Sequence, residues 1–201
     1  MRAEPFILEL RSGWHLQCSS QVGAAAEVVS STRFAPDSWY AADVPTTVLR
    51  ALVRHGVYPD PRFGMNAFRI PDSSPEFNAR HDLDRCSHLP GGRNPWRDPW
   101  WYRTTFALPA LAPDQRVWLT LRCLNYRAEV WVNGRQVAGP EVLVGMFQRF
   151  RLDLTGQVAA GRNALAVRVH PVDHPTCRTP SSRSSARCAS STRRSAATSP
   201  R

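Results

Sequence analysis

The chain has 201 residues, a length that suits one domain or slightly more. Its 26 basic and 16 acidic residues give a formal net charge of +10, and every basic residue in this count is arginine. Apolar residues make up 42% of the chain, no apolar run approaches the length of a membrane span, and the five cysteines are irregularly spaced. This composition excludes a transmembrane helix, a collagen, a coiled coil and a small disulfide scaffold as the main architecture.

Two regular elements are expected in the first half of the chain. Residues 14–20 alternate between apolar and polar side chains, which predicts a short strand. Residues 45–56 predict a helix that begins at a capping threonine and ends at Gly56, a residue suited to the left-handed conformation. The stretch 57–100 is rich in Pro, Gly, Asp, Asn and Arg and predicts a long irregular region, which in compact domains is usually functional or disordered.

From residue 101 the pattern is typical of strands. Asn133-Gly134 is a strong hairpin signal between two of the alternating segments. Together the segments predict an all-β fold, an antiparallel sandwich with one buried face per sheet, in which outward Arg and Trp suit a solvated or ligand-facing surface. The five alternating segments are 101–108, 117–123, 126–132, 149–154 and 165–170. The side chains expected to be buried are Val117, Leu119, Leu121, Val130, Val132, Leu165, Val167 and Val169.

Several stretches, taken together in order and spacing, resemble the N-terminal sugar-binding domain of glycoside hydrolase family 2. The resemblance is closest to the exo-β-D-glucosaminidases, with β-mannosidases as near relatives, and it covers roughly residues 14–172. The stretches that carry it are Asp43–Leu49, Gly56–Asn66, Trp100–Phe106, Ala128–Gly134, Phe150–Thr155 and Gly161–Asn163.

The resemblance implies a jelly-roll β-sandwich of the galactose-binding type. In the family this domain precedes an immunoglobulin-like domain and a (β/α)8 barrel, and the barrel carries both catalytic glutamates. Retaining hydrolysis needs two carboxyl groups about 5–5.5 Å apart, and a barrel alone needs about 250 residues. The chain is therefore expected to hold the accessory domain without the catalytic machinery and to be inactive alone.

The two ends of the chain are interpreted separately from the sandwich. Residues 1–13 form a lead-in whose short apolar run, Phe6-Ile7-Leu8, is no signal-peptide core. We therefore expect a cytoplasmic location by default, although the family is often secreted. Residues 173–201 form a Ser/Arg-rich tail, and from residue 175 onward it has six Arg, no acid and no aromatic residue, Leu, Ile or Val. This tail is expected to be disordered, either as the product of a shifted reading frame or as a natural disordered segment.

Residues 94–101 are the main candidate for a sugar-binding segment. Sugars present flat C–H faces beside hydroxyl groups, so their sites combine aromatic rings with carboxylates, amides or arginine. Trp96, Arg97, Asp98 and Trp100 have this chemistry. The alternative is that the tryptophans fill the core or an interdomain contact.

Asp60 and Asn66 are two further sugar-binding candidates. In the family, the loop that contains them approaches the mouth of the barrel's active site, so Asn66 could donate to a sugar hydroxyl and Asp60 could accept from one. The alternative is turn chemistry, in which the two side chains bond to nearby backbone groups.

The remaining polar residues predict no catalytic, metal or cofactor site. Asp43, Asp98 and Glu129 form no pair suited to acid–base catalysis, and Glu129 is expected to make a solvated pair with an arginine. The histidines lack ligand spacing, and Cys86 with His88 lacks a second pair. The phosphate-binding glycine motifs are missing, so no nucleotide cofactor is expected.

Three functions compete on this basis. The first is a carbohydrate-binding-type domain, separated from a family 2 exo-glycosidase that acts on β-linked glucosamine or mannose. The second is a non-catalytic subunit that completes a glycosidase in trans with a separate barrel, since aromatic residues and Arg are enriched at interfaces. The third is weak, salt-sensitive nucleic-acid binding through the arginine-rich tail, without specificity because the tail has no aromatic residue to stack on bases.

Overall fold

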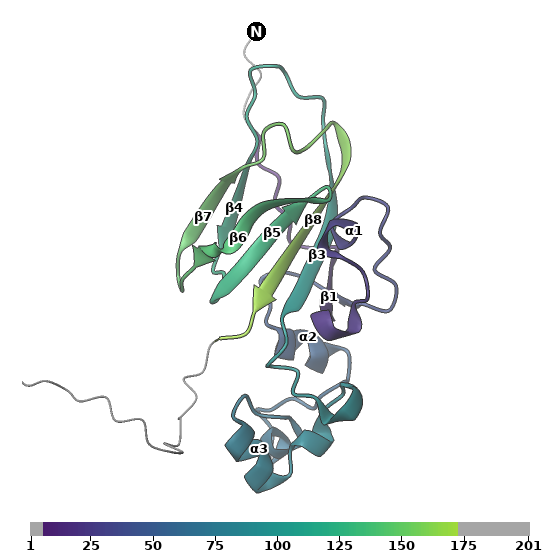
Figure 1. Cartoon of the computed structure of the whole chain (residues 1–201), viewed down its shortest axis with the longest axis vertical. Coiled ribbons are helices and arrows are strands. Elements are labelled where there is room, and N and C mark those ends of the chain that lie inside the picture. The colour runs from purple at the N-terminus through teal and green to yellow at the C-terminus, as the bar shows by residue number, and fades with distance from the viewer. Residues whose placement is uncertain (1–5, 173–201) are drawn as a thin grey trace, which may run out of the picture.

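The computed structural model describes residues 6–172, which form two antiparallel β-sheets and several short helices (Figure 1). Residues 173–201, for which a disordered tail is expected, and the first five residues of the lead-in lie outside the described residues. The strands are β1 Trp14–Cys18, β2 Tyr40–Ala42, β3 Trp100–Leu108, β4 Trp118–Arg122, β5 Arg127–Val132, β6 Arg135–Val144, β7 Arg149–Asp153 and β8 Gly161–His170.

The strands confirm the expected antiparallel sandwich. The larger sheet has six strands in the order β2-β1-β3-β8-β5-β6, and β4 pairs with β7 in a separate two-stranded sheet. Strands β3 and β8 pair without interruption from Trp100↔Val169 to Leu108↔Gly161. Because β3 and β8 lie at the centre of the larger sheet, this register decides which side chains reach each of its faces.

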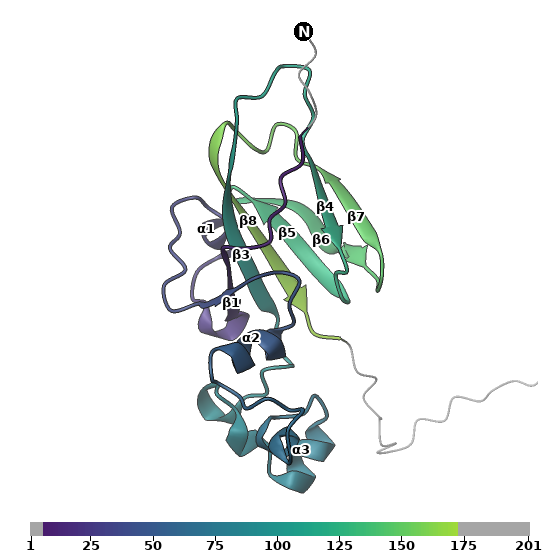
Figure 2. The same ribbon diagram turned by 180° about the vertical axis from the view of Figure 1, so that it is seen from behind.

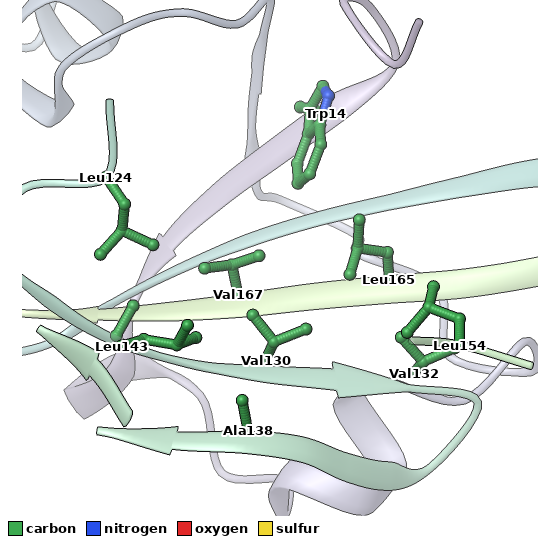
Figure 3. Close-up of a cluster of buried hydrophobic side chains, with 10 residues drawn as sticks. Trp14, Leu124, Val130, Val132, Ala138, Leu143, Leu154, Leu165 and Val167 are labelled. Atoms are coloured by element: carbon green, nitrogen blue, oxygen red, sulfur yellow. The ribbon is translucent and has the colours of Figure 1, made fainter. Parts of the chain in front are cut away.

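The main core lies between the two sheets and is formed by alternate residues of the central strands (Figure 3). Four of the eight residues expected there are buried, and the other four are only half-buried. The half-buried set includes all three residues expected from β4 and its start, because a two-stranded sheet is too narrow to shield them fully. The buried four are Val130, Val132, Leu165 and Val167, and the half-buried four are Val117, Leu119, Leu121 and Val169.

The opposite face of the larger sheet is also covered, which corrects the expectation of one buried face per sheet. Trp101 and Trp131 on this face are 2% and 9% exposed and pack against Val29 of α1 (Ala26–Val29). Figures 1 and 2 both place α1 against β3, on the side of the molecule away from β7. The outward tryptophans therefore hold the segment that follows β1 and do not face a ligand.

Arg103 explains why this covering segment stays in place. Its side chain is 2% exposed, and its guanidinium donates to the backbone carbonyls of Val29, Ser31 and Phe34 at 2.8–3.0 Å. Burying a charged group is costly unless its hydrogen bonds are satisfied, and here one side chain satisfies three carbonyls of an irregular segment. The expectation of a solvated arginine at this outward position was therefore wrong.

The Asn133-Gly134 hairpin between β5 and β6 is confirmed. Both residues have positive φ, 49° and 83°, as a tight two-residue hairpin turn requires. The Asn133 side chain also accepts from the Ala164 amide and donates to the Asn163 side chain and the Gln157 carbonyl. The turn therefore fixes the hairpin and the beginning of β8 together.

The expected helix is confirmed as α2 (Val48–Arg54). Thr47 caps its start by accepting from the Arg50 amide at 3.2 Å. Gly56 has φ +70° after its end, and the amides of Gly56 and Val57 donate to helix carbonyls in the arrangement that usually closes a helix.

The region 57–100, expected to be irregular, contains a helix that the composition did not indicate. Ser74 caps α3 (Pro75–His81) by accepting from the Phe77 amide, and Pro75 occupies the first turn. Short 3-10 segments flank it at Asn66–Arg69, Asp84–Cys86 and Pro90–Gly92. Figures 1 and 2 show α2 and α3 together at one end of the long axis, beyond the strands. We call residues 48–99 the helical extension.

A second core joins the helical extension to the sheet. Leu16 of β1 and Trp100 of β3 pack with Leu52 of α2 and with Tyr58 and Ile70 of the extension. These side chains are at most 6% exposed. The extension is therefore attached to the core-facing side of the larger sheet through packed side chains.

A substitution at Leu165 tests how much the burial of this side chain in the main core contributes to stability. Replacing Leu165, which is 1% exposed, by Ala is expected to lower the free energy of unfolding by about 2–4 kcal/mol through lost burial and a cavity. The matched change Leu119→Ala, at a half-buried site, is expected to cost about half as much. Urea unfolding measures both, and equal losses would contradict the described core.

Candidate functional site

The helical extension contains a groove of about 430 Å³ between α2, α3 and the segment that leads to β3. Its walls are almost entirely apolar, and a carboxylate and a hydroxyl lie at its polar edge. The lining residues are Leu49, Pro61, Ala67, Phe68, Ile70, Pro71, Asp72, Ser73, Phe77, Leu83 and Trp96.

Aromatic rings form much of the groove's accessible wall. Phe68 and Phe77 are 41% and 40% exposed, and their rings stack with centroids 6.3 Å apart. Trp96 is half-buried, and its indole N–H donates to the Pro71 carbonyl, which fixes the orientation of the ring. Of the six residues predicted for sugar binding, Trp96 lines this groove.

A buried asparagine shapes the polar edge of the groove. Asn78 of α3 is fully buried, and its side chain accepts from the Asp72 amide at 2.7 Å and donates to the Asp72 carbonyl at 3.0 Å. It also donates to the Asp84 carboxylate at 2.9 Å. Sequence reasoning missed Asn78, Asp72 and Phe77, although Ser74-Pro75 is a helix-start signal that could have placed them.

The residues around Trp100 that were predicted to bind sugar make contacts within the fold. Trp100 is 4% exposed, and its indole N–H donates to the Pro95 carbonyl at 2.8 Å, so it takes the core role weighed for it. Asp98 pairs with Arg93 at 2.8 Å and accepts from the Cys18 thiol at 3.6 Å. Burial raises the pKa of Asp98, but the hydrogen bonds to its carboxylate outweigh burial and leave the pKa lowered. Arg97 is exposed beside them.

Asp60 and Asn66 make the turn contacts considered for them. The Asp60 carboxylate accepts from the backbone amide and the guanidinium of Arg62, with a shortest distance of 2.6 Å. These hydrogen bonds lower the pKa of Asp60 to about 2. The Asn66 side chain donates to the Asp60 carbonyl at 3.0 Å. Both side chains therefore stabilise the loop after α2, next to the groove.

Glu129 is buried, which corrects the expectation of a solvated pair. It accepts from the Arg168 guanidinium, from the Trp131 indole at 2.9 Å and from His170 at 2.8 Å, and it is 3% exposed. Burial raises the pKa of Glu129, but the hydrogen bonds from its partners outweigh burial and hold the pKa below the ordinary value of 4.5. An ionised carboxylate with four donors stabilises the end of β8 and is poorly suited to proton transfer.

The other chemical possibilities gain no support from residues 6–172. In this part of the chain no three His, Cys, Asp or Glu side chains gather as a metal site, and His88 instead bonds to the Tyr58 hydroxyl at 2.8 Å. No helix among the described residues is long and apolar enough to cross a membrane. The groove offers Asp72 as its single carboxylate, so its lining contains no pair of carboxyl groups for glycoside hydrolysis.

Comparison with known proteins identifies the family. The family described as glycosyl hydrolase 2 galactose-binding domain-like matches residues 93–196. The chain belongs to this family. Because the match begins just before β3, it includes the strands that form most of the sandwich.

Relatives of this glycosyl hydrolase 2 domain are much longer than the chain. An exo-beta-D-glucosaminidase of Streptomyces avermitilis is 31% identical over 160 residues, which is 80% of this chain and 15% of the relative. A mannosylglycoprotein endo-beta-mannosidase of Lilium longiflorum is 34% identical over 172 residues, 83% of this chain and 16% of the relative. The chain thus spans about one sixth of the length of the curated relatives it matches.

The solved structures agree with this assignment. An exo-chitosanase of Amycolatopsis orientalis superposes with a TM-score of 0.65 at 30% identity, over 81% of this chain and 16% of that protein. A beta-D-mannosidase from Dictyoglomus thermophilum, at 18% identity and a TM-score of 0.52, shares the fold. The likeness to the exo-chitosanase therefore covers more of this chain than the family match over residues 93–196 does.

Glu129 gives a prediction for stability and its pH dependence. Glu129→Gln is expected to lower the free energy of unfolding by about 3 kcal/mol at pH 7, because it leaves Arg168 without its buried counter-charge. Since the folded pKa of Glu129 is lowered, its contribution is present above pH 4.5 and is lost as the pH falls through the folded value. The variant should therefore lose less stability than the wild type between pH 7 and pH 3.

Urea unfolding at both pH values measures this difference. Glu141→Gln, at an exposed position of β6, is the matched control and should change stability by less than about 0.5 kcal/mol. An equally steep acid loss in the Glu129 variant would contradict an ionised, hydrogen-bonded carboxylate.

Proposed function

We propose that this chain is the non-catalytic, carbohydrate-binding-type domain of a family 2 exo-glycosidase that acts on β-linked glucosamine or mannose. The observation that carries the proposal is the match of four-fifths of the chain to exo-β-D-glucosaminidases, of which it spans about 15%. A (β/α)8 barrel needs about 250 residues, so the described sandwich accounts for an accessory part of such an enzyme.

The groove of the helical extension supports a sugar-binding role. Phe77 and Trp96 present ring surface that suits the C–H face of a pyranose, and the backbone that carries them is fixed by buried Asn78. Asp72 and Ser73 add polar groups for hydroxyls at one edge. With a single carboxylate among its lining residues, the groove binds and does not hydrolyse.

A second candidate function is docking to a catalytic barrel in trans. Phe63 and Met65, in the loop between α2 and the groove, are 66% and 70% exposed. Apolar side chains exposed next to an apolar groove favour a protein partner over solvent. In this case the groove is completed by the barrel, and the sugar site is shared between the two proteins.

The two functions give different results in one set of assays. The chain alone is expected to leave nitrophenyl-β-glucosaminide and nitrophenyl-β-mannoside unhydrolysed, and to bind glucosamine or mannose oligomers with millimolar affinity, about −4 kcal/mol. Trp96→Ala should weaken this binding several-fold. Phe77→Ala is a second variant because its ring is 40% exposed, and Phe147→Ala, 90% exposed and far from the groove in sequence, is the control.

Calorimetry and a chromogenic assay with a buffer blank measure these quantities. Turnover by the chain alone would contradict the accessory-domain proposal. Turnover that appears after addition of a family 2 catalytic barrel, and that is reduced by Met65→Ser, would favour docking in trans. Binding that is unchanged in both groove variants would move the sugar site away from the helical extension.

A further inference from the structure

The solvent-facing side of the β4–β7 sheet carries an unusual concentration of positive charge. The register pairs Trp118 with Asp153, Thr120 with Arg151, and Arg122 with Arg149, and all of these side chains point away from the main core. Figures 1 and 2 place β4 and β7 on the side of the molecule away from α1. We call the set Trp118, Thr120, Arg122, Arg149 and Arg151 the arginine face.

Two arginines of this face form no ion pair within the part of the chain that the structure describes. Arg122 and Arg149 are exposed and lie directly opposite each other, and no ion pair or hydrogen bond of their side chains occurs among residues 6–172. The nearby acids pair with other arginines: Asp153 with Arg116 at 3.4 Å, and Glu9 with Arg11 at 2.6 Å. The hydrogen bond from Arg11 is the main cause that lowers the pKa of Glu9, and the charge of Arg122 adds a smaller effect.

Like charges directly opposite in an antiparallel pair destabilise the sheet. Paired side chains start about 5 Å apart, and Arg149 and Arg151 follow each other on one face at about 6.6 Å. A bound anion would turn this repulsion into attraction, because the planar guanidinium groups suit bidentate contact with carboxylates. The face is therefore better suited to a negatively charged ligand than to solvent.

Trp118 adds an aromatic surface within the same row. It is 44% exposed, and the Arg151 guanidinium lies 4.3 Å from its ring centroid. This contact is a cation–π interaction that places the Arg151 charge against the Trp118 ring. The exposed hydroxyl of Thr120, opposite Arg151, supplies a further hydrogen-bonding group.

We propose that the arginine face binds a linear polysaccharide that carries carboxylate groups. A five-residue strand is about 16 Å long, so the chain of sugars would lie across an open, flat surface, with its carboxylates at Arg122, Arg149 and Arg151 and a ring edge at Trp118. This site is separate from the groove and does not rest on the proposed function. Cationic glucosamine oligomers would be repelled by this face.

Other polyanions fit the arginine face less well. A protein partner usually needs an apolar centre in its interface, whereas Trp118 is the single large apolar side chain of this face. Double-stranded nucleic acid would bind through phosphates alone and would make no use of the aromatic ring. An acidic sugar could use both features, since its C–H groups can contact the ring and its carboxylates can accept from the guanidinium groups.

Oligogalacturonate, a linear carboxylated polysaccharide, is the probe for this proposal. Calorimetry on the whole chain at low salt should detect binding that weakens as salt rises. Arg149→Gln and Trp118→Ala should each reduce affinity about five-fold, corresponding to about 1 kcal/mol. Arg50→Gln, which removes an exposed arginine from α2, is the matched control and should leave affinity unchanged.

Thermal unfolding distinguishes a ligand-binding role of Arg149 from a purely structural one. Without ligand, Arg149→Gln should raise the Tm by about 1–3 °C because it removes the repulsion from Arg122. The same variant therefore gains stability and loses affinity. A lower Tm would mean that Arg149 supports the fold and would overturn the proposed site.

Three further results would overturn the proposal. The first is a lack of oligogalacturonate binding by the wild type at low salt. The second is equal loss of affinity in the Arg50 control, which would indicate attraction by net charge alone. The third is that the chain binds a DNA duplex at least as tightly as oligogalacturonate and that Trp118→Ala changes neither affinity. This result would indicate that the face binds phosphate groups.

Discussion

Strands β3 and β8 pair from one end of the sandwich to the other, and this pairing sets both faces of the larger sheet. On one face it places Leu165 and Val167 in the main core between the sheets. On the other it brings Trp101 beside Arg168, whose guanidinium lies 5.1 Å from the ring centroid and reaches Glu129 on β5. A shift of one residue would exchange the two sets and would turn the ionised groups of the second face toward the main core.

Most of the strands could be predicted from the sequence because their signals are local, although β2 and β6 lie outside the predicted segments. Alternation of side chains and the Asn133-Gly134 turn act within a few residues, and both reappear in the structure. The cover over the second face could not be predicted in this way. Arg103 bonds to carbonyls about 70 positions earlier in the chain, and an arginine on an alternating strand otherwise indicates a solvated surface.

The candidate site shows the same limit of sequence-based prediction within one short segment, residues 94–101. Trp96 and Trp100 are four positions apart and have the same chemistry, yet Trp96 lines the groove and Trp100 is buried. The difference comes from Leu16 and Leu52, which cover Trp100 from β1 and α2. Composition predicted this segment as a sugar-binding candidate, but which of its side chains lines the groove depends on contacts between elements distant in the sequence.

Arginine has three different environments in this chain. They distinguish the arginines that stabilise the fold from those proposed to bind a ligand. Arg103 is buried and donates hydrogen bonds to backbone carbonyls, while Arg168 is partly buried and balances the charge of Glu129. Arg122 and Arg149 face each other in solvent at a cost to the sheet. Net charge alone does not distinguish these cases, since each residue adds one positive charge. The contacts of Arg103 and Arg168 explain those two charges within the fold, whereas Arg122 and Arg149 form no ion pair among residues 6–172, and this is why the ligand site is proposed at the second pair.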